Sequence, residues 1–204
     1  RKKDAVPTLN TDWWNYGGIT RDVKLIETSE TFVEDYFIQL DPNNNKNIKG
    51  ELTLDGKNIV KQRVHISIPE LNISNEYTTD EKGNFKIDIK SNKIRYWSVD
   101  DPYLYDITIK TEEDEITDQI GFRTIKTEGS NILLNDESIF LKGISIHEES
   151  PINGGRGYSE EDAKQLLTWA QELGCNYVRL AHYPHNEHMV RLADKMGILV
   201  WEEN

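Results

Sequence analysis

Residues 159–201 read SEEDAKQLLTWAQELGCNYVRLAHYPHNEHMVRLADKMGILVW, and this stretch decides the class of fold. Two segments with helical periodicity alternate with two short apolar segments. Ser159 is typical of a helix N-cap before an acidic first turn, whereas Gly174 and Gly197 are typical helix ends. The apolar stripes are Ala163, Leu166, Leu167, Ala170 and Leu173 in the first helix, and Met189, Val190, Ala193 and Met196 in the second. This order predicts a parallel α/β unit.

The stretch before these helices supplies one more predicted strand. Residues 139–146 (IFLKGISI) form a nearly continuous apolar run, as expected of a strand buried on both faces of a parallel sheet. With strands at 176–181 and 198–201, the order becomes β-α-β-α-β. We expect only the opening of a parallel sheet, because the chain stops before such a sheet closes.

Residues 32–125 have a different period. Short segments with period two are separated by turns such as 41–45 (DPNNN) and 80–83 (DEKG), which predicts an antiparallel β-sandwich. The predicted strands include 36–40, 52–54, 64–68, 85–89 and 107–109. Two further strand-like runs, at 13–14 and 23–26, are too short to form a domain alone.

Composition narrows the class of protein and of ligand. A hydrophobic fraction of 36% with 29% charged residues describes a globular protein with a packed core. The net charge of -12 disfavours nucleic acid and acidic membranes, which bind clustered Lys and Arg, so a neutral or weakly charged ligand fits better. One cysteine, Cys175, excludes disulfide stapling but leaves the compartment open between bacterial periplasm and cytoplasm. Both chain ends are expected to be cut from a longer protein, since neither a signal peptide nor a terminal cap is recognisable.

Three groups of residues, in chain order, are similar to motifs of one known family. They are 12–21 (DWWNYGGITR); then Trp97 with 102–105 (PYLY) and 121–123 (GFR); then 141–143 (LKG), 147–148 (HE) and 179–184 (RLAHYP). Together they run over nearly the whole chain. The chain therefore resembles glycoside hydrolase family 2.

The resemblance implies a multidomain β plus α/β architecture. Residues 1–28 would be the tail of a sugar-binding jelly-roll domain, and 29–125 an immunoglobulin-like β-sandwich. Residues 126–204 would be the first strands and helices of a truncated (β/α)8 TIM barrel.

The resemblance also implies an activity: a retaining exo-β-glycosidase that hydrolyses terminal β-galactosides or β-glucuronides. In such enzymes one carboxylic acid protonates the leaving oxygen and a second carboxylate, about 5–5.5 Å away, attacks the anomeric carbon. The family carries these glutamates at the ends of barrel strands 4 and 7. We therefore expect no catalytic residue in this chain, with both glutamates beyond Asn204, and expect the chain alone to be inactive.

Strand ends supply the expected sugar-binding residues. By resemblance, His182 hydrogen-bonds sugar hydroxyls at the C-terminal face of the barrel, where barrel active sites lie. Arg179 would face the barrel interior and keep the nucleophile carboxylate ionised, because a nearby cation lowers a carboxylate pKa. Asp12 would be a direct ligand of the non-reducing sugar, and His147 and Glu148 candidates for the pocket rim. One of Glu202 and Glu203, with Glu203 preferred, should point into the pocket.

Simpler interpretations of the same residues remain open. Arg179 also fits a structural ion pair, and Asp12 a turn or cap before the two tryptophans, which pack between domains as readily as they stack on sugars. The acidic run 112–115 is most simply a solvated turn.

A metal site is a further reading of one histidine-rich stretch. His182, His185, His188 and Glu187 invite it, but Pro184 interrupts the spacing that two ligands on one helix face need. We expect no cofactor, although a magnesium or sodium ion occurs in some relatives of the family.

Three function classes follow from these readings. The leading one is the glycosidase; the alternatives are a non-catalytic β-sandwich interaction module and a metal-dependent hydrolase. The expected partner is a carbohydrate substrate, with no nucleic acid and no membrane, and a homo-oligomer is possible.

Overall fold

The computed structural model describes residues 16–204, which form two compact units. One unit comprises Ile26–Phe140, and the other combines Leu141–Asn204 with residues 16–25. The predicted run at 13–14 and the predicted ligand Asp12 lie outside the described residues. Within residues 16–204, no helix has the length and apolarity needed to cross a membrane.

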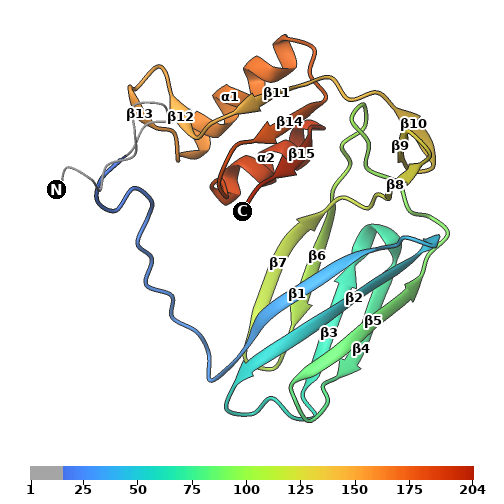
Figure 1. Cartoon of the computed structure of the whole chain (residues 1–204). Coiled ribbons are helices and arrows are strands. Elements are labelled where there is room, and N and C mark those ends of the chain that lie inside the picture. Colours follow the sequence, from blue (N-terminus) through green and yellow to red (C-terminus); the bar gives the residue numbers. More distant parts are fainter. Residues whose placement is uncertain (1–15) are drawn as a thin grey trace. The chain divides into compact units, whose positions relative to one another are not determined.

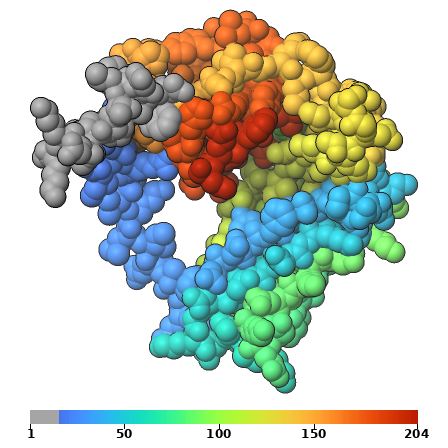
Figure 2. Space-filling view, in the orientation of Figure 1, coloured from blue at the N-terminus to red at the C-terminus, as the bar shows by residue number. Residues whose placement is uncertain are grey.

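The unit Ile26–Phe140 contains the predicted antiparallel β-sandwich, which is confirmed (Figure 1). One sheet has the order β1-β2-β5, with β1 Thr31–Asp41, β2 Asn44–Gly56 and β5 Asn84–Lys90. The other has the order β4-β3-β6-β7, with β4 Ile73–Thr78, β3 Arg63–Ile68, β6 Tyr105–Lys110 and β7 Glu115–Ile120. A single 3-10 turn, η2 Pro69–Leu71, joins β3 to β4. Figure 2 shows the atoms of β1 and β2, in blue to cyan, packed side by side.

Alternation along the strands builds the sandwich core. In β3, Val64, Ile66 and Ile68 are buried, and the residues between them are partly exposed. Trp97 is fully buried, and the guanidinium carbon of Arg123 lies 4.2 Å from the centre of its ring. Apolar side chains from both sheets therefore meet between them, as the period of two predicts.

The structure corrects two expectations for this part of the chain. Residues 23–26 form no strand, and Leu25 is exposed. The acidic run does form the β6–β7 turn, but it is not merely solvated. A Glu113 carboxylate oxygen accepts the backbone N–H of Thr31 at 3.0 Å, and an Asp114 oxygen accepts that of Val33 at 2.9 Å. These two carboxylates tie the start of β1 to the turn.

A small three-stranded sheet follows the sandwich and corrects the predicted strand at 139–146. Its strands are β8 Ile125–Glu128, β9 Asn131–Leu134 and β10 Glu137–Ile139. Asn135 and Asp136, both with positive φ, form the turn between β9 and β10, which is the geometry that tight hairpins require. The apolar run is therefore split, with Ile139 ending β10 and Phe140 80% exposed.

The α/β unit has the predicted order, and its sheet is parallel with the order β11-β14-β15. Its main elements are β11 Gly143–Ile146, α1 Glu160–Glu172, β14 Tyr177–Leu180, α2 Glu187–Met196 and β15 Leu199–Glu202. A short hairpin, β12 Glu149–Ser150 and β13 Gly155–Arg156, lies between β11 and α1 (Figure 1).

The caps and most of the helix stripes are as predicted. The Ser159 side chain accepts the backbone N–H of Asp162 at 3.1 Å, and Gly197 ends α2 with a φ of 74°. Buried alanines of both helices, Leu167 of α1 and Met189 of α2 form one core cluster with Val178 and Leu180 of the central strand. Two stripe members are wrongly predicted as core, because Leu173 and Val190 are 70% and 43% exposed.

Candidate functional site

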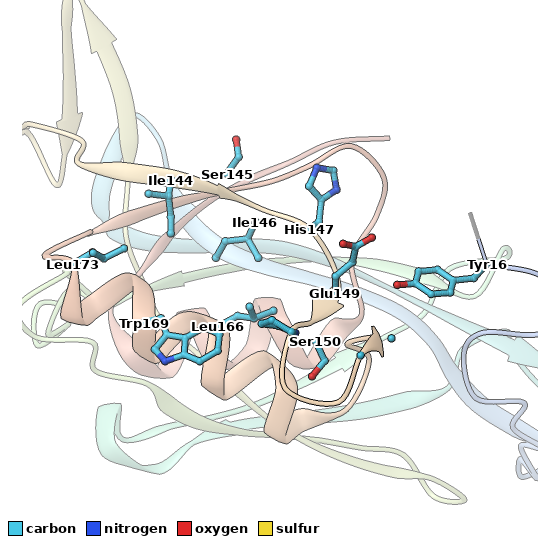
Figure 3. Close-up of a pocket in the computed structure, with 13 residues that line it drawn as sticks. Tyr16, Ile144, Ser145, Ile146, His147, Glu149, Ser150, Leu166, Trp169 and Leu173 are labelled. Atoms are coloured by element: carbon cyan, nitrogen blue, oxygen red, sulfur yellow. The ribbon is translucent and has the colours of Figure 1, made fainter. Parts of the chain in front are cut away.

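The C-terminal ends of the three parallel strands carry a group of polar side chains. We call Ser145, His147, Arg179, His182 and Glu203 the strand-end cluster. Ser145 and Arg179 are register partners in β11 and β14, so their side chains leave the sheet on the same face. Figure 3 shows Ser145 and His147 projecting from one side of β11, away from helix α1. The alternation of a strand therefore separates these polar groups from the apolar side chains that pack on the helices.

Arg179 and Glu203 form the centre of the cluster. Nε and Nη2 of Arg179 donate to Oε1 of Glu203 at 3.1 and 2.9 Å, and Nη2 also lies 3.1 Å from Oε2. Nη1 of Arg179 donates to Oγ of Ser145 at 3.2 Å. Such a forked contact fixes the plane of the guanidinium as well as its position. The structural ion pair that the sequence left open for Arg179 is therefore present.

His182 completes the centre of the cluster. Its Nδ1 lies 3.0 Å from Nη2 of Arg179 and 3.1 Å from Oε2 of Glu203. Since a guanidinium only donates and a carboxylate only accepts, the ring accepts from Arg179 when Nδ1 is unprotonated and donates to Glu203 when it is protonated. The His147 ring stands edge-on to the His182 ring, with 5.3 Å between their centres. The two histidines predicted for the pocket are therefore neighbours.

The charge balance at the centre of the cluster keeps Glu203 ionised. Loss of solvent around Glu203 raises the pKa of its carboxyl, but hydrogen bonds and charge from Arg179 and His182 outweigh that effect, so the pKa lies below its ordinary value. An ionised carboxylate that already accepts from a guanidinium is a poor proton donor. Glu203 is therefore suited to orienting Arg179 and His182 and unsuited to general acid catalysis.

A second polar group surrounds Glu148, and we call Arg21, Glu148, Arg156, Tyr183 and Asn186 the Glu148 knot. The Glu148 side chain is 1% exposed. Its Oε2 accepts from Nη2 of Arg21 at 2.9 Å, and from Nε and Nη2 of Arg156 at 3.1 and 2.9 Å. Its Oε1 accepts the backbone N–H of Asn186. With no exposed surface, Glu148 does not form a pocket rim, and that expectation is wrong.

Tyr183 holds the other side of the knot. Its hydroxyl oxygen accepts the backbone N–H of Glu148 at 3.1 Å, and the Arg156 guanidinium carbon lies 4.5 Å from the centre of its ring. Burial, as the largest influence, raises the pKa of Tyr183, so the hydroxyl stays neutral. Sequence reasoning did not single out Arg21, Arg156, Tyr183 or Ser145, although the first and third lie inside motifs that it quoted.

The histidine-rich stretch has a different arrangement from the metal reading. Nε2 of His185 donates to the backbone oxygen of Ala181 at 2.9 Å, and the backbone N–H of His185 donates to Oε1 of Glu202 at 2.8 Å. Glu202 thus binds backbone, whereas Glu203 joins the strand-end cluster. Among residues 16–204, no group of three or more His, Cys, Asp or Glu side chains comes together as a metal site would need.

The α/β unit also contains an open pocket of about 900 Å³. Its walls include Ile144, Leu166 and Trp169, together with Tyr16 and Glu149 (Figure 3). Of the strand-end cluster, only Ser145 and His147 line it. This pocket is therefore mostly apolar, whereas the hydrogen-bonding groups that polar ligands need are gathered at the strand ends.

Comparison with known proteins identifies the family. Residues 31–123 match the family model described as "Glycosyl hydrolases family 2", and residues 125–204 match "Glycosyl hydrolases family 2, TIM barrel domain". Among curated relatives, a β-glucuronidase of Paenibacillus borealis is 30% identical over 199 residues, covering 93% of this chain and 32% of the relative. A β-galactosidase of Arthrobacter sp. (strain B7) is 29% identical, covering 93% of this chain and 18% of the relative.

Solved structures agree with the sequence matches. A β-galacturonidase from Eisenbergiella tayi, crystallised with galacturonate, matches 87% of this chain and 33% of its own, with a TM-score of 0.72 and 28% identity. A β-glucuronidase from Ruminococcus gnavus matches 85% of this chain and 30% of its own, with a TM-score of 0.68 and 28% identity. The chain spans about a third or less of the length of these relatives. Its sandwich and the parallel strands that follow correspond to consecutive domains of these enzymes, and the chain belongs to glycoside hydrolase family 2.

Proposed function

We propose that this chain is part of a retaining exo-β-glycosidase that hydrolyses terminal β-galactosides or β-glucuronides. The observation that carries the proposal is the strand-end cluster. A forked arginine–glutamate pair and two adjacent histidines stand at the C-terminal ends of consecutive parallel strands, in a chain of a glycosidase family. Active sites of parallel α/β barrels are built at that end of the strands.

The proposal includes a domain order for the parent protein. Residues 1–28 are the tail of a jelly-roll domain, 29–125 an immunoglobulin-like sandwich, and 126–204 the first part of the barrel. The family models, which divide between residues 123 and 125, support the second boundary. The compact unit that contains the sandwich extends further, to Phe140, because the small β8–β10 sheet groups with it.

Within the proposed pocket, each predicted residue has a distinct task. His182 and His147 offer imidazole nitrogens to sugar hydroxyls, because a neutral imidazole can donate at one nitrogen and accept at the other. Glu203 fixes the plane of Arg179, and Arg179 presents positive charge toward the barrel interior. Asp12 is proposed as a ligand of the non-reducing sugar.

The bond-breaking groups of this proposal lie beyond Asn204. One glutamic acid gives its proton to the leaving oxygen while a glutamate attacks the anomeric carbon, and water later hydrolyses the glycosyl ester with the first residue now acting as base. Positive charge from Arg179 lowers the pKa of a neighbouring carboxylate and so keeps the nucleophile ionised. Glu203 takes neither role, because its carboxylate is already engaged by Arg179 and His182.

The alternative of a non-catalytic sandwich module is not favoured. Curated relatives that match both parts of the chain carry glycosidase names. A metal-dependent hydrolase would need ligands that residues 16–204 do not bring together.

The first test is direct. The parent reading frame should continue past Asn204 with an Asn-Glu pair after the next helix and strand, and its absence would rule out this glycosidase. The 204-residue chain should not hydrolyse 4-nitrophenyl β-galactoside or β-glucuronide, whereas the complete protein should hydrolyse one of them. Robust turnover by the 204-residue chain would contradict the location of the carboxylates.

The second test addresses the cluster in the complete protein. Arg179→Ala should lower kcat/KM by about 100-fold or more, because a charge that acts on the nucleophile is lost. Arg63→Ala is the matched control, since Arg63 is exposed on the sandwich, and it should leave kcat/KM unchanged. Equal activity of the two variants would remove Arg179 from the proposed pocket.

A further inference from the structure

The Glu148 knot joins segments that are far apart in the sequence. Glu148 follows β11, Arg156 ends β13, and Asn186 is the N-cap of α2. Arg21 belongs to the segment before the sandwich, and it also donates to the backbone oxygen of Pro184. One buried carboxylate therefore accepts hydrogen bonds from three separate parts of this unit.

Electrostatics explains why the carboxylate controls these contacts. A buried carboxylate requires charged partners, and here two guanidiniums share it. The Arg156 side chain is 16% exposed and stacks on Tyr183, so it stays in place without Arg21. The Arg21 side chain is 39% exposed, and water can solvate it once it leaves. Of the two pairs, the one with Arg21 is the more readily opened.

The segment that carries Arg21 has little else to hold it. Gly17 and Gly18 are exposed, Ile19 is 81% exposed and Val23 is 79% exposed, so this stretch buries little apolar surface. Tyr16 lies near Arg156, with 6.0 Å between its ring centre and the guanidinium carbon. Docking of the segment therefore depends strongly on the ion pair between Arg21 and Glu148.

We propose that Glu148 is a positioning residue of the sugar pocket, which ties the segment Tyr16–Arg21 and the loop after β14 to one point. The inference rests on the proposed function. Tyr183, Pro184 and Asn186 follow His182 directly in the chain, so the knot fixes the backbone that presents His182.

Limited trypsin digestion of the 204-residue chain tests the docking without any activity. Trypsin must take the Arg21 side chain into its own pocket, and it cannot do so while Arg21 is held by Glu148. Glu148→Gln removes the charge and should accelerate cleavage after Arg21 about tenfold, the loss expected for one weakened charge pair. Cleavage after Lys24, which is exposed on the same segment, is the internal reference and should change less than twofold.

Glu172→Gln is the matched control, because Glu172 is an exposed carboxylate in the last turn of α1. It makes the same change in charge and should alter neither cleavage rate. Equal rates after Arg21 in wild type and Glu148→Gln would overturn the docking. If Glu148→Gln accelerates both cleavages, Arg21→Gln replaces it, read by hydrogen exchange of the backbone amides of residues 17–20, which should accelerate about tenfold.

Kinetics of the complete protein test the effect on the pocket. Glu148→Gln and Arg21→Gln should each lower kcat/KM for the hydrolysed nitrophenyl glycoside about tenfold, mainly through KM, and the double variant should lose no more than the worse single variant. An unchanged kcat/KM in Arg21→Gln, with a released segment, would overturn the positioning role and leave the proposed function standing. A complete wild-type protein without hydrolysis would instead overturn the proposed function, and the positioning role of Glu148 with it, while the digestion still reports on docking.

Discussion

Gly143→Ala offers a quantitative test of the parallel sheet that presents the strand-end cluster. Gly143 begins β11 and is the register partner of Tyr177 in β14. A Cβ at this position would stand 2.5 Å from the backbone oxygen of Tyr177, 3.0 Å from Cε1 of its ring and closer still to Cδ1. Glycine is therefore required here by close approach of a neighbouring strand, not by an unusual φ.

The free-energy cost of Gly143→Ala depends on which atoms must move to make room for the added methyl group. Ordinary contacts between non-bonded carbons lie at about 3.5–4.0 Å, so the methyl group needs roughly 1 Å more room. The Tyr177 ring can rotate, but its carbonyl belongs to the β11–β14 pairing and cannot retreat without loosening that pairing. Overpacking of this kind costs about 1–3 kcal/mol, and we expect about 2 kcal/mol because backbone is involved. For a unit of 60–100 residues, that lowers Tm by roughly 8–16 °C.

The assay must report on the α/β unit alone. Because the chain divides into two compact units, a whole-chain melting curve does not follow one two-state transition. Hydrogen exchange in urea, followed by mass spectrometry in peptides spanning 143–146 and 177–180, isolates the parallel strands. Peptides from β3 and β6 of the sandwich should be unaffected and serve as the reference within the same sample.

Gly155→Ala is the matched control. Gly155 lies in β13, and an added Cβ there would meet no atom within 4 Å. The variant should stay within about 0.5 kcal/mol of wild type. A Gly143→Ala variant that is as stable as Gly155→Ala would refute the tight pairing of β11 with β14, and with it the placement of Ser145 beside Arg179.

Three further predictions concern the core, a cap and pH. Leu167→Ala should destabilise the α/β unit by about 2–5 kcal/mol, because Leu167 is fully buried, whereas Leu173→Ala should be nearly neutral, and exchange of the α1 peptides compares them. Ser159→Ala removes the oxygen that caps α1 and should cost about 1 kcal/mol, measured in the same peptides. The pKa of the Glu203 carboxyl in the folded chain is below its ordinary value. Ionised Glu203 therefore stabilises the fold at any pH above the unfolded pKa. This stabilisation is lost as the pH falls through the folded pKa. The difference in the urea midpoint of the α/β unit between wild type and Glu203→Gln should therefore disappear at acid pH. A difference that does not depend on pH would contradict the pairing of Glu203 with Arg179.

The sequence by itself determined the structural features that depend on a few neighbouring residues. The N-cap at Ser159 and the αL end at Gly197 depend on single residues and their immediate neighbours, so both were predictable and both are present. Period-two alternation likewise predicted β3 and β6. It did not reveal β4 and β7, in each of which a polar residue, Asn75 or Asp118, interrupts the apolar inward-leaning positions.

Tertiary structure decided what depends on distant neighbours. Nothing within residues 139–146 says that Ile139 pairs with Ile132 in a separate hairpin while Ile144 pairs with Val178 in the parallel sheet, because apolarity alone does not specify a partner strand. The same holds for the polar residues at the strand ends.

From the sequence alone, Glu148 and Glu203 were both acidic residues near strand ends. Only the folded chain distinguishes the buried Glu148 carboxylate, which pairs with two arginines, from the Glu203 carboxylate, which orients Arg179 and His182. The physical reason is that hydrogen-bond partners and burial are set by which strands lie side by side, and that arrangement is a property of the whole unit.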